Sequence, residues 1–235
     1  MAKGKLKCRF CNEELTPGNL ECNSCHLPQV QATLVDREIK QLIEMDVIVV
    51  DPILKLDEQL TPAGIDLRLD VYFRELQHMT IGAIDLAIEL PAREFYQLRE
   101  LDIQKKGEEF YFIQPGDFVL AQSFEYIYVP PFICGHLGGR SSLAKSGIEI
   151  HATSERIDPG FRGHLTLEIK NVGKMPVKLY PLQRVANLMF ELTSEVDIPY
   201  EGAFQHQVRI KPPKPDKDLV RWLQFLEGNQ ASASE

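Results

Sequence analysis

The sequence predicts a mainly β protein, built as a sandwich, jelly roll or distorted barrel with few short helices. Between residues 60 and 200, short runs rich in aromatic and β-branched residues alternate with glycine and proline. Apolar residues at helical spacing are confined to short stretches. The first 30 residues hold four of the five cysteines, in two Cys-x-x-Cys pairs, which predicts a small separate unit ahead of the β domain.

Length and charge limit the possible functions. The chain of 235 residues allows one sizeable domain and a small one. A net charge of −8 and a pI near 5.4 argue against a bulk DNA-binding surface, although a local basic pocket could still hold a nucleotide. No apolar run is long enough to span a membrane, and the basic start lacks an apolar signal core, so we expect a cytosolic protein without a membrane partner. We divide the chain into residues 1–30, 31–208 and 209–235.

The cysteine pairs predict a structural zinc ribbon over residues 1–30. Cys8 and Cys11 form one pair, and Cys22 and Cys25 form the other. Four thiolates complete a tetrahedral Zn²⁺ shell and leave no open position for catalysis. Metal binding would supply the folding free energy that so short a segment lacks. Two redox pairs or unmetallated thiols are the alternatives, and the sequence does not identify a partner for the ribbon.

The remaining elements follow from local patterns. Residues 35–45 have helical apolar spacing, and Thr33 with Asp36 resembles a capping box. Residues 90–101 are either a short helix or an insertion. We expect strands at residues 65–71, 83–90, 109–113, 118–122, 126–129, 166–169, 177–180 and 184–192.

The tail differs in composition from the β domain. Residues 210–217 form an extended linker rich in proline and lysine. Residues 219–226 predict a short apolar helix around Trp222, and residues 228–235 are expected to be disordered.

Residues 139–168 carry the chemistry. They begin with GRSS, read as a tight turn with a cation, two hydroxyls and backbone N–H groups, which suits phosphate oxygens. Residues 157–163 have the turn chemistry of a hairpin. Glu168 lies among apolar strand residues, where a carboxylate is costly unless it is paired or functional. Together they suggest a nucleotide site; an ordinary charged turn and a solvated strand face are the alternatives.

At these residues the chain resembles a known family. The motifs GRSSLA, H-x-T, RIDPGFRG and LTLEIKNVGKMPVKLYP resemble the dCTP deaminase branch of the trimeric dUTPase-like nucleotide enzymes. GIDLRLD upstream and PYEGAFQHQ downstream extend the resemblance over residues 34–207. The cysteine unit and the tail lie outside it.

The resemblance implies a distorted barrel of the dUTPase-like type, a homotrimer with active sites at subunit interfaces, and hydrolytic deamination of dCTP to dUTP and ammonia. The family uses a carboxylate, not zinc, to activate water, and Mg²⁺ accompanies the triphosphate. One alternative is a bifunctional enzyme that also cleaves dUTP to dUMP and pyrophosphate. A non-enzymatic alternative is a nucleotide-binding regulatory protein that uses the ribbon as an interaction module.

The resemblance also implies site residues. The catalytic candidates are Glu168, Ser141 and Lys145. The nucleotide-binding candidates are Arg140, Ser141, Ser142, His151, Ala152, Thr153, Ser154, Arg156, Asp158, Phe161, Tyr200 and Gln207. The chain departs from the family pattern at Lys145, usually arginine, at Ser154, usually small and apolar, and at Ala203, often a phosphate-binding lysine. We expect the GRSS segment and Glu168 to meet across the trimer interface.

Overall fold

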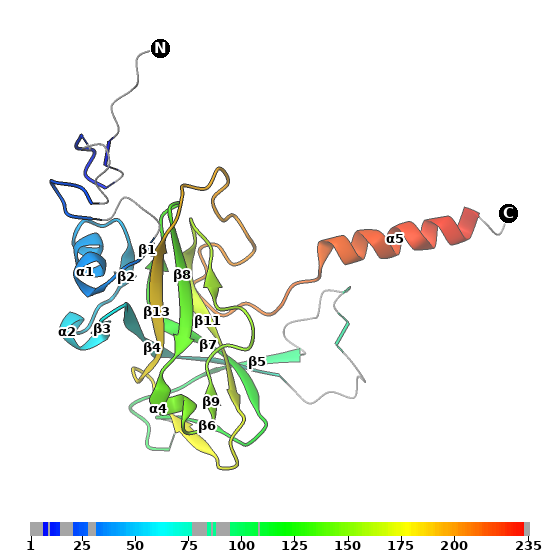
Figure 1. Ribbon diagram of the computed structural model, residues 1–235. Coiled ribbons are helices and arrows are strands. Elements are labelled where there is room, and N and C mark those ends of the chain that lie inside the picture. The colour runs from blue at the N-terminus through cyan, green and yellow to red at the C-terminus, as the bar shows by residue number, and fades with distance from the viewer. Residues whose placement is uncertain are drawn as a thin grey trace.

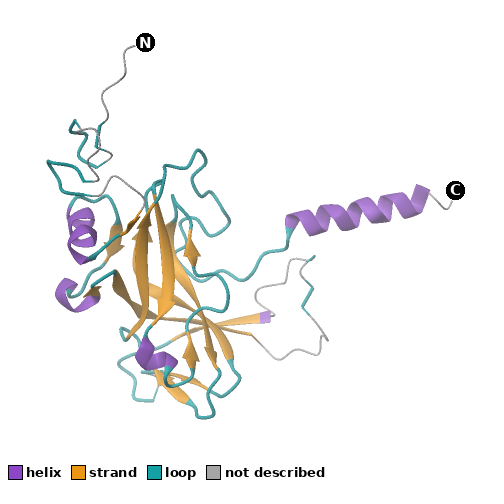
Figure 2. Ribbon diagram, viewed as in Figure 1, coloured by secondary structure: helices purple, strands orange, loops and turns teal. Residues whose placement is uncertain are grey.

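The computed structural model confirms a mainly β fold with a curled sheet and few short helices (Figures 1 and 2). It describes residues 7–8, 10–14, 21–27, 32–76, 84–85, 87, 95–107 and 109–232. The strands are β1 (Ala32–Thr33), β2 (Val49–Asp51), β3 (Leu60–Thr61), β4 (Gly64–Leu76), β5 (Tyr96–Glu100), β6 (Tyr111–Ile113), β7 (Phe118–Tyr128), β8 (Ile133–Gly139), β9 (Ile148–Glu149), β10 (Arg156–Ile157), β11 (Arg162–Asn171), β12 (Val177–Leu179) and β13 (Arg184–Leu192). The helices are α1 (Asp36–Glu44), α2 (Leu56–Gln59), α4 (Ser141–Ala144) and α5 (Lys217–Ser232).

Most of the described strands belong to one 11-stranded sheet, ordered β10-β8-β13-β4-β7-β11-β9 along its main path. β4 bends the sheet, because its first residues pair with β13 and its later residues pair with β7 and β5. β6 and β12 form a separate two-stranded sheet. This curled arrangement encloses the core and places β7 and β11 side by side in one wall of the sheet.

The core is formed by the inward faces of the long strands. On β11, Leu165, Leu167 and Ile169 are buried, whereas the intervening residues are only partly covered. This is the alternation expected for a strand with one face on the core. Phe73 of β4 and Tyr111 of β6 stack with ring centroids 4.4 Å apart, which joins the small sheet to the large one.

The strands expected at residues 118–122 and 126–129 are one continuous strand, β7. The polar residues that interrupt the apolar pattern are buried and hydrogen-bonded. The Ser123 hydroxyl donates to the Glu125 carbonyl at 2.7 Å. The Glu125 carboxylate accepts hydrogen bonds from the Gln59 side chain at 2.9 Å and the Arg68 backbone at 2.8 Å. The structure also contains β8, which no strand pattern predicted because three of its seven residues are glycine.

Other local expectations also change. α1 lies where a helix was expected, but Thr33 belongs to β1; the Glu38 carboxylate instead accepts from the Val35 N–H at 2.9 Å. Within residues 90–101, the described part forms β5, paired with β4. The strand expected at residues 83–90 lies largely outside the described residues.

Two turns differ from their predicted form. The segment 157–163 is not a hairpin, because β10 pairs with β8 whereas β11 pairs with β7 and β9. The GRSS segment is not a simple turn either, since its serines begin α4, whose Leu143 N–H donates to the Arg140 carbonyl at 3.0 Å.

The tail ends in α5, which extends away from the β body in Figure 1. This helix is longer than expected and includes residues 228–232, which were predicted to be disordered. Trp222 is 56% exposed and Phe225 is 63% exposed. In the part of the chain that the structure describes, no helix has the length and apolar character to cross a membrane.

Candidate functional site

A cavity of about 380 Å³ opens along β11 and β7. Part of the sequence-predicted set lines it: Ser154, Arg156, Asp158, Phe161, Glu168, Tyr200 and Gln207. The remaining wall consists of Tyr96, Phe118, Leu120, Leu137, Ile157, His164, Leu165, Thr166, Phe204, Lys211 and Pro213. Apolar walls with a few convergent polar groups are typical of a small-molecule site.

Glu168 lies on the β11 face opposite the core. Its neighbours Leu167 and Ile169 are fully buried, which fixes the strand and directs the carboxylate toward the cavity. The Ala152 N–H donates to Glu168 Oε2 at 2.9 Å, which links the loop of residues 151–154 to the strand. The described residues provide no hydrogen-bond donor to Oε1. A held carboxylate with one free oxygen can accept a proton from a bound water.

Arg156 and Asp158 form an ion pair at the rim. The Arg156 Nε atom lies 2.8 Å from Asp158 Oδ1, and the side chains are 69% and 40% exposed. The Phe161 N–H donates to the Asp158 carbonyl at 3.1 Å, which closes the turn between β10 and β11. The Phe161 ring lies 5.8 Å from the Tyr200 ring, so the two aromatic residues form one side of the cavity.

The segment around Gln207 is fastened to β11 of the same chain. Gln207 is 1% exposed, and its amide donates to the His164 carbonyl at 3.1 Å and to Thr166 Oγ1 at 2.9 Å. The His164 N–H donates back to the Gln207 carbonyl at 2.9 Å. This close approach requires Gly163, because φ is +148° there and an added Cβ would lie 2.8 Å from the Gln207 nitrogen.

A second group of predicted residues lies outside the cavity wall: Arg140, Ser141, Ser142, Lys145, His151, Ala152 and Thr153. Of these, Ala152 reaches Glu168 through its backbone. His151 Nδ1 is buried and has no hydrogen-bond partner among the described residues. A single chain does not bring Ser141 or Lys145 onto the wall that contains Glu168.

Arg140 belongs to a charged cluster that the sequence did not reveal. Its Nε lies 3.1 Å from Asp66 Oδ2, and Arg184 Nη1 lies 3.4 Å from the same oxygen. The Asn187 amide donates to Asp66 Oδ1 at 3.0 Å. The Asp66 side chain is only 5% exposed, so two arginines share one buried carboxylate. The signal available in the sequence is Asp66 in an otherwise apolar strand start, GIDL, a pattern that strand alternation alone also explains.

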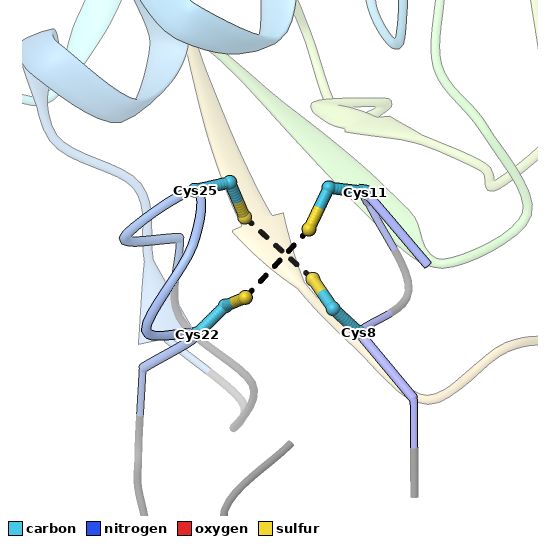
Figure 3. A group of neighbouring side chains, drawn as sticks. All are labelled: Cys8, Cys11, Cys22 and Cys25. Atoms are coloured by element: carbon cyan, nitrogen blue, oxygen red, sulfur yellow. Dashed lines mark hydrogen bonds between the residues drawn. The ribbon is translucent and has the colours of Figure 1, made fainter. Parts of the chain in front are cut away.

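The four ribbon cysteines converge on one point (Figure 3). Cys8 and Cys25 have sulfurs 3.6 Å apart, Cys11 and Cys22 have sulfurs 3.7 Å apart, and all four sulfurs lie within 4.8 Å of one another. A tetrahedral zinc site with Zn–S bonds of about 2.3 Å has sulfur separations of roughly 3.8 Å. Backbone N–H groups of Cys25 and Ser24 lower the pKa of Cys22 to about 7, whereas burial raises the pKa of Cys25 well above its ordinary value, so a bound cation is needed to hold all four sulfurs as thiolates. The donor set therefore fits a metal ion.

The described ribbon residues also pack on the β body. Leu27 is fully buried within the main hydrophobic core. The Phe10 ring meets the Phe132 ring edge to face at 5.7 Å, and the Gln41 amide of α1 donates to the Cys25 carbonyl at 2.7 Å. The metal-binding cysteines are thus tied to the same core that supports the cavity.

The curled sheet places the chain in the dUTPase-like fold class. A solved structure of 2'-deoxycytidine 5'-triphosphate deaminase from Agrobacterium tumefaciens has the same fold, with a TM-score of 0.54, 20% identity and 70% of this chain covered. The chain spans about half of that protein, with 49% covered.

The dCTP deaminase-like family matches residues 33–193, and the chain belongs to this family. Over 191 residues it is 38% identical to the dUMP-forming dCTP deaminase of Methanobrevibacter smithii, with 81% of this chain and 96% of that protein covered. Over 203 residues it is 41% identical to the dUMP-forming dCTP deaminase of Thermobifida fusca, with coverages of 84% and 99%. The predicted family is confirmed.

Proposed function

We propose that the protein is a bifunctional enzyme that deaminates dCTP and releases dUMP and pyrophosphate. The observation that carries this proposal is that Glu168 and Asp158 line one cavity in a chain whose relatives are named dUMP-forming. The bifunctional alternative therefore replaces deamination to dUTP alone as the leading hypothesis.

Glu168 and Asp158 have different roles in the two reaction steps, deamination and cleavage of the triphosphate. In deamination, water adds to C4 of cytosine, and Glu168 takes one proton from this water and gives it to N3 of the ring. Glu168 then takes the second proton from the new C4 hydroxyl and gives it to the amine, so that ammonia departs and C4 becomes a carbonyl. In the second step, water cleaves the bond between the α- and β-phosphates, and Asp158 is the candidate base. Mg²⁺ would accompany the triphosphate and neutralise part of its charge. Ser154, which lines the cavity, is assigned to the pocket for the base, together with His151 and Thr153 of the same loop, which lie outside the cavity wall of a single chain.

We further propose a homotrimer in which Arg140, Ser141, Ser142 and Lys145 of a neighbouring copy complete the cavity. Support comes from their position, because within one chain they lie outside the wall that contains Glu168. A mixture of Ser141→Ala and Glu168→Gln variants, denatured and refolded together, should recover part of the activity, since some mixed sites would receive both intact residues. No recovery in confirmed mixed trimers would contradict a shared site.

The direct experiment is incubation of the purified protein with dCTP and Mg²⁺, followed by separation of the products. We expect dUMP and pyrophosphate. Accumulation of dUTP alone would support the deaminase without the second activity. Tight dCTP binding without turnover would favour the regulatory, non-enzymatic alternative.

Glu168→Gln should abolish turnover and preserve dCTP binding, because the amide keeps the shape but cannot accept a proton. Glu149→Gln, an exposed change on neighbouring β9, is the matched control and should retain activity. An active Glu168→Gln enzyme would show that another group activates water.

For the ribbon, we propose structural Zn²⁺ held by Cys8, Cys11, Cys22 and Cys25. The short distances between sulfurs support a closed four-thiolate site. A metal-bound thiol cluster fits the reducing cytosol, which is the location we propose.

A further inference from the structure

The cavity wall contains two side chains with permanent positive charge, Arg156 and Lys211. Arg156 is paired through its Nε atom with Asp158 Oδ1, which lies 2.8 Å away. Lys211 differs, because no carboxylate of the described residues forms an ion pair with it. Its Nζ donates to the Ala203 carbonyl at 3.0 Å, which leaves two of its three N–H donors available.

The backbone of Lys211 is held in place although it lies in the proline-rich linker of residues 210–217. Ile210, the preceding residue, is 1% exposed, and its N–H donates to Gln122 Oε1 at 3.0 Å. The Ile210 carbonyl accepts from Arg74 Nε at 3.1 Å. The Lys211 N–H itself faces Gln207 Oε1 at 3.4 Å. The backbone that carries the Lys211 side chain is therefore fixed beside the cavity.

We infer that Lys211 is a phosphate-binding residue of the nucleotide site. This inference rests on the proposed function, since it needs a nucleotide in the cavity. Residue 203 is an alanine, so the segment of residues 200–207, which borders the cavity, has no charged side chain at this position. The hydrogen bond from Lys211 to the carbonyl of residue 203 brings a cation to that place from eight positions further along the chain. A polyphosphate gains more from this cation than a monophosphate does, so Lys211 contributes to selection for the triphosphate.

The test compares Lys211→Met with Lys214→Met. Methionine keeps an unbranched side chain and removes the charge; Lys214 is exposed and does not line the cavity. The probe is α,β-imido-dCTP with Mg²⁺, measured by calorimetry, and dCMP serves as the comparison ligand. We expect Lys211→Met to weaken analogue binding about tenfold, as for loss of one charge-assisted hydrogen bond, with a much smaller effect on dCMP. The analogue affinity of the variant should also depend less on salt.

A second substitution tests whether position, and not folding, causes the loss. Adding Ala203→Lys to the Lys211→Met variant should restore analogue affinity, because the new ammonium group comes from the residue that Lys211 now contacts. The inference is overturned if Lys211→Met matches Lys214→Met, or if dCTP analogue and dCMP weaken equally. A wild-type protein that binds the analogue but forms no dUMP would refute the proposed function and leave the test of Lys211 intact. A wild-type protein that does not bind the analogue would overturn both.

Discussion

Glu125 provides a quantitative test of how the β body is held together. The residue lies within β7 and is fully buried, with both carboxylate oxygens hydrogen-bonded to Gln59 and Arg68. Burial, partly offset by these hydrogen bonds, raises the pKa of Glu125 from 4.5 to about 7. The folded protein therefore binds this proton more tightly than the unfolded chain does. The resulting stabilisation is complete below pH 4.5 and is lost as the pH rises through 7.

The pKa shift of Glu125 sets the size of the pH-dependent stabilisation. A rise from 4.5 to about 7, at about 1.36 kcal/mol for each pKa unit, corresponds to about 3 kcal/mol of unfolding free energy. Glu125→Gln removes the titration. The amide of the variant can accept only one of the two hydrogen bonds. Gln59 cannot flip its side-chain amide to present an acceptor instead, because its Oε1 already accepts from the Leu54 N–H. That lost bond costs about 1 kcal/mol at every pH. Relative to the variant, the wild-type protein should therefore lose about 3 kcal/mol between acid and neutral pH.

The assay is urea unfolding at about pH 5, 6, 7 and 8, at fixed protein and metal concentration, for wild type and variant. Glu195→Gln, at an exposed position, is the control and should follow the wild-type curve. Other ionisable groups cancel in the difference between wild type and variant. A difference that stays constant across this pH range would refute the reasoning, since Glu125 would then not change its protonation on unfolding.

Two further predictions concern the ribbon and the segment around Gln207. Wild-type protein should contain one zinc per chain, and Cys22→Ser should lose the zinc and lower the melting temperature of the whole chain. The control is Cys134→Ser, which lies away from the cluster and should retain the metal. Equal zinc content in both variants would contradict the site. Gln207→Ala should weaken the attachment of the segment around Gln207 to β11 by about 1–3 kcal/mol, because its partners on β11 lose their donor. It should raise KM for dCTP more than it lowers kcat, whereas Gln114→Ala, at an exposed position, should change neither; an unchanged KM for Gln207→Ala would contradict the role of this segment.

Sequence patterns predicted the elements that depend on neighbouring residues. β11 is the clearest case, because one of its faces meets the core and the other borders the cavity, so a period of two is visible in the sequence. The cysteine pairs were equally local. β8 has no such pattern, since its glycines allow close packing: a Cβ at Gly135 would lie 2.9 Å from Ile157. The continuity of β7 depends on partners of Glu125 that are at least 57 positions away in the chain.

In the candidate site, too, the sequence predicts neighbouring residues but not contacts between distant ones. The residues between 151 and 168 that were assigned to it lie close together in sequence, and several of them do line one cavity. Tyr96, Phe118 and Lys211 come from distant segments. Strand pairing brings Tyr96 and Phe118 to the wall, whereas Lys211 is placed by the hydrogen bonds of Ile210 to Gln122 and Arg74. The partnership of Arg140 with Asp66 is likewise a product of the sheet, because β4 and β8 both pair with β13.

The packing of Phe10 on Phe132 has a consequence for comparisons within the family. Phe132 lies in the β body, yet part of its ring is covered by a residue of the cysteine unit. A relative that lacks the cysteine unit would expose an aromatic residue at this position to water, and a polar residue there would be less costly. The residue that aligns with Phe132 should therefore be aromatic or aliphatic where the four cysteines are present and polar where they are absent. One position in the β body would then report whether a relative carries the metal-binding unit, even in a sequence whose beginning is missing.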